Sequence, residues 1–151
     1  MYLFGFGSLI NLASAQKSFK RVLSQNDLKP IKIKGYERVW NAIESIAFEG
    51  KNVNRVFLNI QENKNSILDG VVIEISDEEL EVLKIREKNY SCIVIKSTDV
   101  LDETIKSDLI AFMTTKKEKI AFTFDHSRTD LVFGRVDQYC LPKRKWCLNL
   151  G

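Results

Sequence analysis

The sequence contains no apolar run that approaches the roughly 18 to 20 residues a membrane-spanning helix requires. The longest candidates, 92–95 and 109–113, are far too short. The apolar stretch at the N-terminus has no basic residues ahead of it and is interrupted by Gly5, Gly7 and Ser8, so we expect no signal peptide. These absences predict a cytoplasmic protein with no membrane partner.

Residues that form disulfides or bind metals are also scarce. The three cysteines, Cys92, Cys140 and Cys147, are an odd number with no C-x-x-C pair, and His126 is the only histidine. These four side chains are enough in number for one zinc ion, but their spacing matches no common zinc motif. We therefore expect thiols in a reducing compartment and no metal site.

The chain has no large excess of positive or negative charge: its formal net charge is +3 and its pI is near 8.7. The basic clusters at 116–117 and 143–145 are short, as is typical of solvated turns or tails, so we expect no nucleic-acid partner. A basic interaction protein that uses 143–145 is an alternative, and it would bind nucleic acid in a salt-dependent way.

Linkers and repeats are absent as well, and Pro30 and Pro142 are the only prolines. The 151 residues, 44% of them hydrophobic and 28% charged, are typical of an ordinary globular protein and are enough to bury a core. The chain is therefore predicted to form a single domain over 1–151.

The first half of the chain predicts strands around one short helix. An aromatic strand covers 2–6, and isoleucine alternating with lysine predicts a strand at 31–34. Runs at 56–60 and 67–75 predict paired strands, with a hairpin turn at 63–66 between them. Ser14 is expected to cap a helix that carries, on one stripe, Ala15, Phe19, Val22 and Leu23.

In the second half, residues 76–79 (SDEE) form a capping box that predicts a helix to about Lys88. Strands are expected at 92–96, 109–115 and 120–124. From Ser127 a stripe of Val132, Val136 and Tyr139 indicates a helix, although Gly134 disfavours it. Because strands outnumber helices and their spacing is hairpin-like, we predict an α+β domain with one curled, mostly antiparallel sheet.

One residue of the predicted helix, Glu87, lies on its apolar stripe, between Leu80 and Leu83 in projection. A carboxylate there is costly unless it is paired or a site requires it. Two structural interpretations stay open: Glu87 reaches solvent at the rim of the helix end, or it forms an ion pair with Lys84. The third interpretation is a functional carboxylate.

The segment 5–9 (GFGSL) follows the first strand and is the second candidate site. Glycines at a strand end allow the backbone to approach a ligand and to direct N–H groups at an anion, although they also suit a plain tight turn. The segment is neither a phosphate-binding Walker loop nor a G-x-S-x-G elbow. Ser8 as a nucleophile with His126 as its base is a further alternative.

Three stretches, in this order, resemble the γ-glutamylcyclotransferase-like (AIG2-like) family. Residues 6–11 (FGSLIN) are similar to the family's Tyr-Gly-Ser-Leu or Tyr-Gly-Ser-Asn loop, with Phe6 in place of the tyrosine. Residues 35–41 (GYERVWN) resemble its glycine-aromatic stretch with an arginine, and 70–80 (GVVIEISDEEL) resemble the strand and helix start before its acidic residue. That residue corresponds to Glu87, and the following aromatic to Tyr90. The resemblance covers about 1–96.

The resemblance implies a small mixed, mostly antiparallel β-barrel flanked by helices, with the glycine-serine loop and the acidic helix end at one cavity. It implies an enzyme that cyclises a γ-glutamyl amide to 5-oxoproline and releases an amine or amino acid. Glu87 would transfer the protons, and an apolar helix face would raise its pKa toward the working pH. The residues expected to bind the small γ-glutamyl substrate are Phe6, Gly7, Ser8, Leu9 and Tyr90. No metal or organic cofactor is implied, and no oligomeric state is predicted.

The chain departs from the family pattern in several places. Lys84 stands where many members carry an aspartate, and an ion pair with Glu87 would oppose the rise in pKa. Residues 88–89 replace a common glycine, and the segment from Gln138 onward matches poorly. Asn11 stands where glutathione-specific relatives carry tryptophan, which disfavours glutathione as substrate. A non-catalytic small-molecule-binding member of the same fold is the alternative interpretation.

Overall fold

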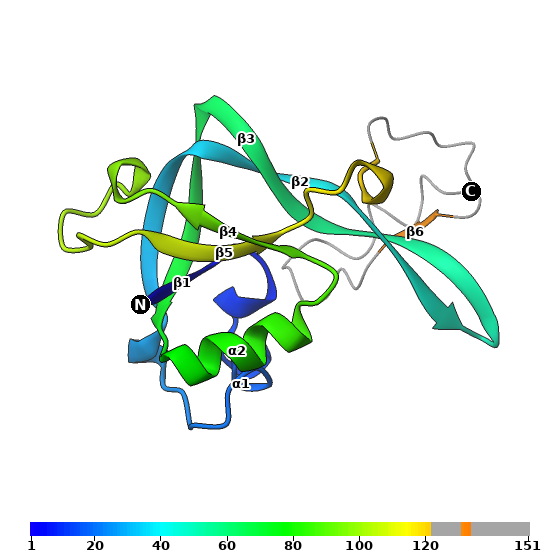
Figure 1. The fold of residues 1–151 in the computed structure, drawn as a ribbon, viewed down its shortest axis with the longest axis horizontal. Helices are drawn as coiled ribbons and strands as arrows, with labels where there is room; N and C mark the ends of the chain where they lie inside the picture. Colours follow the sequence, from blue (N-terminus) through cyan, green and yellow to red (C-terminus); the bar gives the residue numbers. More distant parts are fainter. Residues whose placement is uncertain (122–130, 134–151) are drawn as a thin grey trace.

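The computed structural model describes residues 1–121 and 131–133 and arranges them around one β-sheet (Figure 1). The strands are β1 (Tyr2–Gly5), β2 (Lys29–Phe48), β3 (Lys51–Glu74), β4 (Ser91–Ile95), β5 (Leu109–Met113) and β6 (Leu131–Phe133). The α-helices are α1 (Leu12–Gln16) and α2 (Asp77–Arg86). Single 3₁₀ turns form η1 (Ser8–Ile10), η2 (Gln25–Asp27), η3 (Ser97–Asp99) and η4 (Lys117–Lys119).

The sheet has the order β2-β3-β1-β5-β4, with β6 paired to β3. The pairs β1–β3, β2–β3 and β4–β5 are antiparallel, whereas β1–β5 and β3–β6 are parallel. The predicted α+β class and mostly antiparallel sheet are therefore confirmed, but the predicted closed barrel is wrong. Among the described residues, the five-residue β4 pairs with β5 alone, and the chain beyond it meets β2 at one isolated bridge, between Ile33 and Val100.

The longest feature is the hairpin of β2 and β3, which extends away from the body of the sheet (Figure 1). Its turn lies at Glu49 and Gly50, whose φ angles of 49° and 75° are both positive, as a two-residue hairpin turn requires. The hairpin predicted at 63–66 is wrong, because both of the strands it was to join belong to β3. Those four residues instead lie opposite Gly35 (φ 86°) as a bulge.

Helix α2 begins as the capping box predicts. The Ser76 Oγ accepts from the Glu79 N–H at 3.2 Å, and the Glu79 carboxylate accepts from the Ser76 N–H at 3.1 Å. The helix ends at Arg86, two residues before the predicted end, and it buries Leu80 and Leu83. The sequence pattern thus locates this helix because both its cap and its apolar side are encoded locally.

Helix α1 is shorter than predicted and begins earlier. Asn11, not Ser14, is its N-cap, since the Asn11 Oδ1 accepts from the Ser14 N–H at 3.1 Å. The helix has only five residues, so the predicted apolar stripe does not persist: Val22 is 88% exposed. The other three residues of the predicted stripe are buried, namely Ala15, Phe19 and Leu23.

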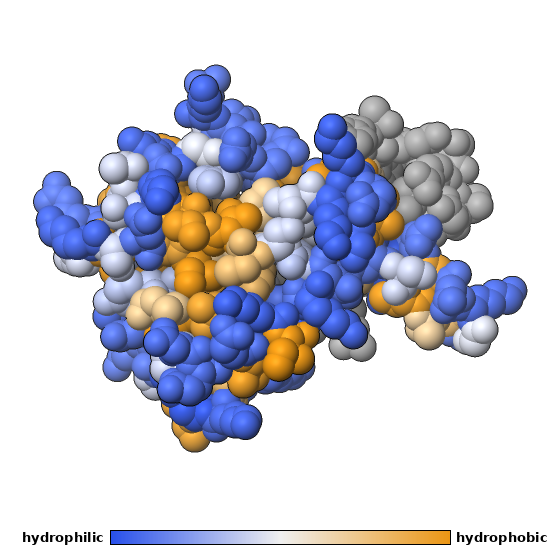
Figure 2. Space-filling view, in the orientation of Figure 1, coloured by the Kyte–Doolittle hydropathy of each residue, from blue (hydrophilic) through white to orange (hydrophobic). Residues whose placement is uncertain are grey.

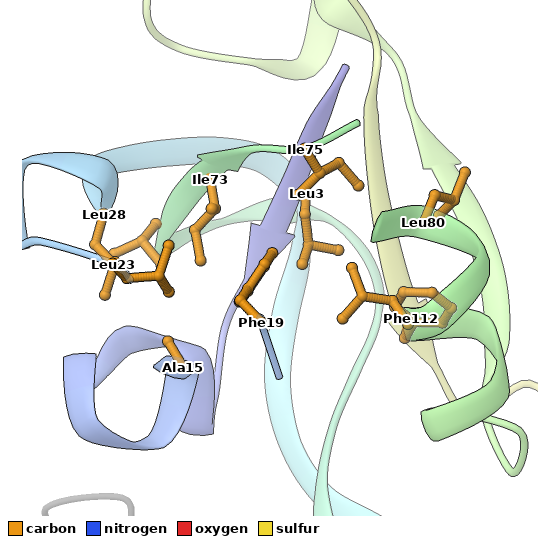
Figure 3. Close-up of a cluster of buried hydrophobic side chains, with 11 residues drawn as sticks. Leu3, Ala15, Phe19, Leu23, Leu28, Ile73, Ile75, Leu80 and Phe112 are labelled. Atoms are coloured by element: carbon orange, nitrogen blue, oxygen red, sulfur yellow. The ribbon is translucent and has the colours of Figure 1, made fainter. Parts of the chain in front are cut away.

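The core divides between the two faces of the sheet, since neighbouring strand residues point to opposite faces. Leu3 joins the cluster that also receives α1 and α2, and Figure 3 shows residues of both helices converging there with Phe19, Ile73 and Phe112. Phe4 joins the second cluster, which includes Ile33, Ile60, Leu109 and Met113. Figure 2 shows apolar side chains gathered on the face that carries β4 and β5, surrounded by hydrophilic residues.

The predictions for the last part of the chain are only partly covered by the described residues. Ile120 forms a bridge with Ala42, but 122–124 of the predicted strand lie outside them. A helix through Val132 is wrong, because 131–133 form β6, parallel to β3. Also outside the described residues are Val136, Tyr139, His126, Cys140, Cys147 and the cluster 143–145. Within the described part, no helix is long and apolar enough to cross a membrane.

Candidate active site

A pocket of about 90 Å³ opens where β1 ends and the chain leaves the sheet. Its floor and walls come from the end of β1, the loop into η1, the end of α2, and single residues of β3 and β5. The described residues that line it are Phe4, Gly5, Phe6, Gly7, Ser8, Leu9, Leu58, Leu83, Glu87, Tyr90 and Phe112. All six residues predicted from the sequence, from Phe6 to Leu9 with Glu87 and Tyr90, therefore lie around one cavity.

The loop beside the pocket is packed so closely that two positions require glycine. A Cβ on Gly5 would lie 2.6 Å from the Cβ of Leu9, so the loop returns onto its own strand only because Gly5 has no side chain. A Cβ on Gly70 of β3 would lie 2.5 Å from the Phe4 ring and 2.6 Å from the Gly5 carbonyl oxygen. These contacts place the segment 6–9 against the end of the sheet.

Arg38 of β2 also holds this loop. Its Nε donates to the Phe6 carbonyl at 2.9 Å, and one terminal nitrogen donates to the Asp69 carbonyl at 2.7 Å. The guanidinium therefore ties the loop to β3 with two charge-assisted hydrogen bonds. The sequence placed Arg38 in a stretch with family resemblance, but its partner in the loop is revealed only by the tertiary structure.

Glu87 occupies the C-cap of α2 and lines the pocket. Its backbone N–H donates to the Leu83 carbonyl at 2.8 Å, and its own carbonyl accepts from the Tyr90 N–H at 2.8 Å. The side chain is 28% exposed, which places it between the open rim and the closed interior. The reverse turn after α2 therefore brings Glu87 and Tyr90 to the same cavity.

Burial raises the pKa of the Glu87 carboxyl above its ordinary value. The Arg86 guanidinium, 3.7 Å away, lowers the pKa in part, whereas the negative charge of Glu44 on β2 raises it further. The ion pair expected between Glu87 and Lys84 does not form: Lys84 instead binds Glu81 at 2.7 Å. Lys84, where the chain departs from the family pattern, therefore does not pair with the Glu87 carboxyl.

The chemistry available in the pocket is that of one carboxyl group among apolar walls and backbone amides. Glu87 is the only charged side chain among the described lining residues. The described residues hold no group of three or more histidine, cysteine or acidic side chains arranged to bind a metal. Ser8 lines the pocket, and His126 lies outside the described part of the chain. Asn11 caps α1 and does not line the pocket.

Leu58 and Phe112 are among the lining residues that sequence reasoning did not single out. Both are apolar residues within strands, so their pattern indicates only burial. Their position at the pocket depends on the pairing of β3 and β5 with β1, which involves residues far apart in the sequence.

Known proteins resemble this chain in their fold and not in their sequence. No model of a protein family matches the chain, and no curated protein matches it in sequence. Among solved structures, a γ-glutamyl cyclotransferase is 12% identical, with 77% of this chain and 67% of that chain covered and a TM-score of 0.54. A yeast γ-glutamyl cyclotransferase specific to glutathione is 14% identical, with coverage of 83% and 74% and a TM-score of 0.54.

A third solved structure, YkqA from Bacillus subtilis, is 21% identical, with 78% of this chain covered and a TM-score of 0.55. The matched part spans 41% of YkqA, and about two thirds (67%) of the first cyclotransferase. The glycine-serine loop, the acidic helix end and these likenesses agree on one architecture. The chain has the γ-glutamyl cyclotransferase-like fold.

Proposed function

We propose that the chain is a cytoplasmic enzyme that cyclises a γ-glutamyl amide to 5-oxoproline and releases an amine or amino acid. The observation that carries the proposal is the Glu87 carboxyl, whose pKa is raised by burial and which shares a pocket with the loop 6–9. A carboxyl tuned toward neutral pH within a cavity is typical of an acid–base residue. The likeness to cyclotransferase structures supports the same reaction class.

The proposed reaction needs a pocket that folds the glutamyl arm, a group that moves protons and hydrogen-bond donors for the carbonyl oxygen. The substrate's α-amine attacks its own γ-carbonyl carbon, so a C–N bond forms in the ring while the original amide C–N bond breaks. The enzyme must hold the glutamyl arm in a folded, near-attack shape, and the apolar walls Leu58 and Phe112 suit its methylene groups. No second substrate is needed, because the nucleophile and the carbonyl belong to one molecule.

Protons must also move from the attacking nitrogen to the leaving nitrogen, and in the proposal Glu87 carries them. As a carboxylate it takes a proton from the attacking ammonium, and as a carboxylic acid it gives that proton to the leaving nitrogen. The nitrogen in the ring loses its second proton by the same route, so the product is a neutral lactam and the amine leaves as an ammonium ion. An ordinary glutamate, with a pKa near 4.3, is a weak base at neutral pH. Burial of Glu87 raises its pKa and so strengthens it as a base.

The backbone of the loop 6–9 has a separate role in the proposal. Its N–H groups would hold the oxyanion that develops on the γ-carbonyl, or the α-carboxylate of the substrate. Gly5 and Gly70 permit the close packing that keeps this loop against the sheet, and Arg38 fixes the Phe6 carbonyl. The loop is thus held in position before the substrate binds.

A non-catalytic small-molecule-binding protein of the same fold is the second candidate. The observation in its favour is the Arg86 guanidinium, which lies 3.7 Å from the Glu87 carboxylate and lowers its pKa in part. A carboxylate held charged in this way would bind a cationic ligand without accepting a proton.

The test is a 5-oxoproline assay on a panel of γ-glutamyl amino acids, γ-glutamyl amines and glutathione. Glu87→Gln is compared with Glu103→Gln, a control at an exposed position that does not line the pocket. We expect oxoproline from one substrate class, about 100- to 10,000-fold slower with Glu87→Gln and unchanged with the control. An unchanged rate in Glu87→Gln would remove this residue from the mechanism. No product from any compound, with ligand still protecting against heat, would favour the binding protein.

A further inference from the structure

The sheet has a gap beside the pocket. β1 lies between β3 and β5, but it pairs with β3 only at Tyr2–Gly5 and with β5 at its first two residues (Figure 1). The chain then leaves the sheet to form η1, whereas β3 and β5 both continue past this point. Between Val71, which pairs with Gly5, and Val56, where the pairing with β6 begins, no described strand pairs with this edge of β3.

The side chain of Asn59 in β3 bridges this gap. Its Oδ1 accepts from the Thr114 N–H at 2.9 Å, and its Nδ2 donates to the Thr114 carbonyl at 3.1 Å. The Nδ2 also donates to the Oδ1 of Asn41 on β2 at 2.9 Å. The carboxamide, 1% exposed, therefore offers Thr114 the donor and acceptor that an opposing residue in a neighbouring strand would offer.

The two ends of this bridge adjoin two walls of the pocket. Leu58 directly precedes Asn59 in β3, and Phe112 lies two residues before Thr114 in β5. Both Leu58 and Phe112 line the pocket. The Asn59 carboxamide therefore joins the two segments of chain that carry these apolar walls.

A second contact extends the bridge to β4. The hydroxyl groups of Thr115 and Ser91 form a hydrogen bond at 2.5 Å. Ser91 directly follows Tyr90, which lines the pocket. The end of β5 is thus anchored on one side by β3 and on the other by β4, and each anchor lies next to a pocket residue.

We propose that Asn59 is a positioning residue of the active site, which holds Leu58 against Phe112 and so sets the width of the pocket and keeps it dry. The inference rests on the proposed function. Asn59 itself does not line the pocket, so it acts through these two side chains. An amide is suited to this place because a buried side chain must here satisfy both the N–H and the carbonyl of one residue, Thr114.

Removal of the bridge would change the surroundings of Glu87 in a defined way. Water would enter between the walls, and the burial that raises the pKa of Glu87 would diminish. The charged groups that act on this carboxyl, Arg86 at the end of its own helix and Glu44 on β2, are not part of the bridge. The pKa of Glu87 is therefore expected to fall.

The experiment compares Asn59→Ala and Asn59→Ser with Asn65→Ala, an exposed control in the bulge of β3. The pKa of Glu87 is followed by NMR titration of its ¹³C-labelled carboxyl, and the pH profile of kcat/KM is measured with the substrate that the panel identifies. In both Asn59 variants we expect a lower pKa of Glu87, an acid limb moved to lower pH, and a roughly 10- to 100-fold loss of kcat/KM. In the control we expect neither change.

The outcomes separate this inference from the proposed function. A folded Asn59→Ala with the wild-type pKa of Glu87 overturns the positioning role, since a merely structural residue would leave that pKa unmoved. If the wild type turns over no γ-glutamyl compound, the proposed function fails, but the NMR titration still decides on Asn59. If Asn59→Ala does not fold, Asn59→Ser decides by the same titration, and global unfolding of both variants also counts against a local role.

Discussion

Replacement of Glu87 by glutamine tests the electrostatics of the pocket through stability alone, without any substrate. Because burial raises the pKa of Glu87, folding disfavours its charged form, and the carboxylate destabilises the native state at neutral pH. Below the ordinary value of 4.5 the group is protonated in both the folded and unfolded states, and this destabilisation vanishes. Glutamine resembles the protonated form, so Glu87→Gln should stabilise the protein at neutral pH and not at acidic pH.

The expected gain follows from the surroundings of the carboxyl. A buried polar group that is incompletely compensated costs about 1–3 kcal/mol in mutational data. Glu87 is still 28% exposed, and Arg86 compensates part of its charge from 3.7 Å, so the low end of that range applies. We expect the free energy of unfolding to rise by about 1 kcal/mol at about pH 8 and to be unchanged at about pH 4, measured by urea denaturation.

Asp108→Asn is the matched control of opposite sign. The Ser97 N–H at 2.8 Å and the Lys96 ammonium at 3.1 Å lower the pKa of Asp108, so its charge adds stability above the ordinary value of 3.8. That stability is lost as the pH falls through the lowered pKa. Asp108→Asn should therefore destabilise at neutral pH. A Glu87→Gln variant that is destabilised, or equally affected at both pH values, would refute the burial argument.

Three further substitutions test the packing of the pocket. Gly70→Ala should destabilise by about 1–3 kcal/mol in urea, because its Cβ meets the Phe4 ring at 2.5 Å; wild-type stability would contradict the close contact. Leu83→Ala should cost about 2–5 kcal/mol in the same assay, since this side chain is 2% exposed. Arg38→Ala should lower the free energy of unfolding by about 1 kcal/mol, because the hydrogen bond to the Phe6 carbonyl is lost. It should also lower kcat/KM about tenfold; an unaltered kcat/KM would show that the loop 6–9 keeps its position without Arg38.

Local features of the fold were predictable from the sequence. The capping box at 76–79 and the stripe of Leu80 and Leu83 locate α2, since both depend on residues within two turns. The strands at 92–96 and 109–115 correspond to β4 and β5 because alternation and apolar content are also local. Glu87 and Tyr90, which line the pocket, were predicted as site residues through the order and spacing of motifs that resemble one family.

Predictions that depended on distant pairing failed. The composition of 63–66 is typical of a turn, but the same residue types also suit the bulge that these residues form opposite Gly35. The hairpin turn lies elsewhere, where Gly50 supplies a positive φ. The barrel was expected from the family resemblance, but closure depends on the pairing of strand edges far apart in the chain. The helix predicted through Val132 gave way to a strand because β3 offers a free edge there.

The sequence alone located two features that line the pocket: a glycine-serine loop after the first strand, and an acidic residue at the end of helix α2. Only the tertiary structure decided what surrounds them. Leu58, Phe112, Arg38 and Asn59 reach the pocket, or support it, through contacts across dozens of residues. Local sequence encodes helix caps and alternation, whereas the width of a pocket and the pKa of its carboxyl depend on which distant strands meet there.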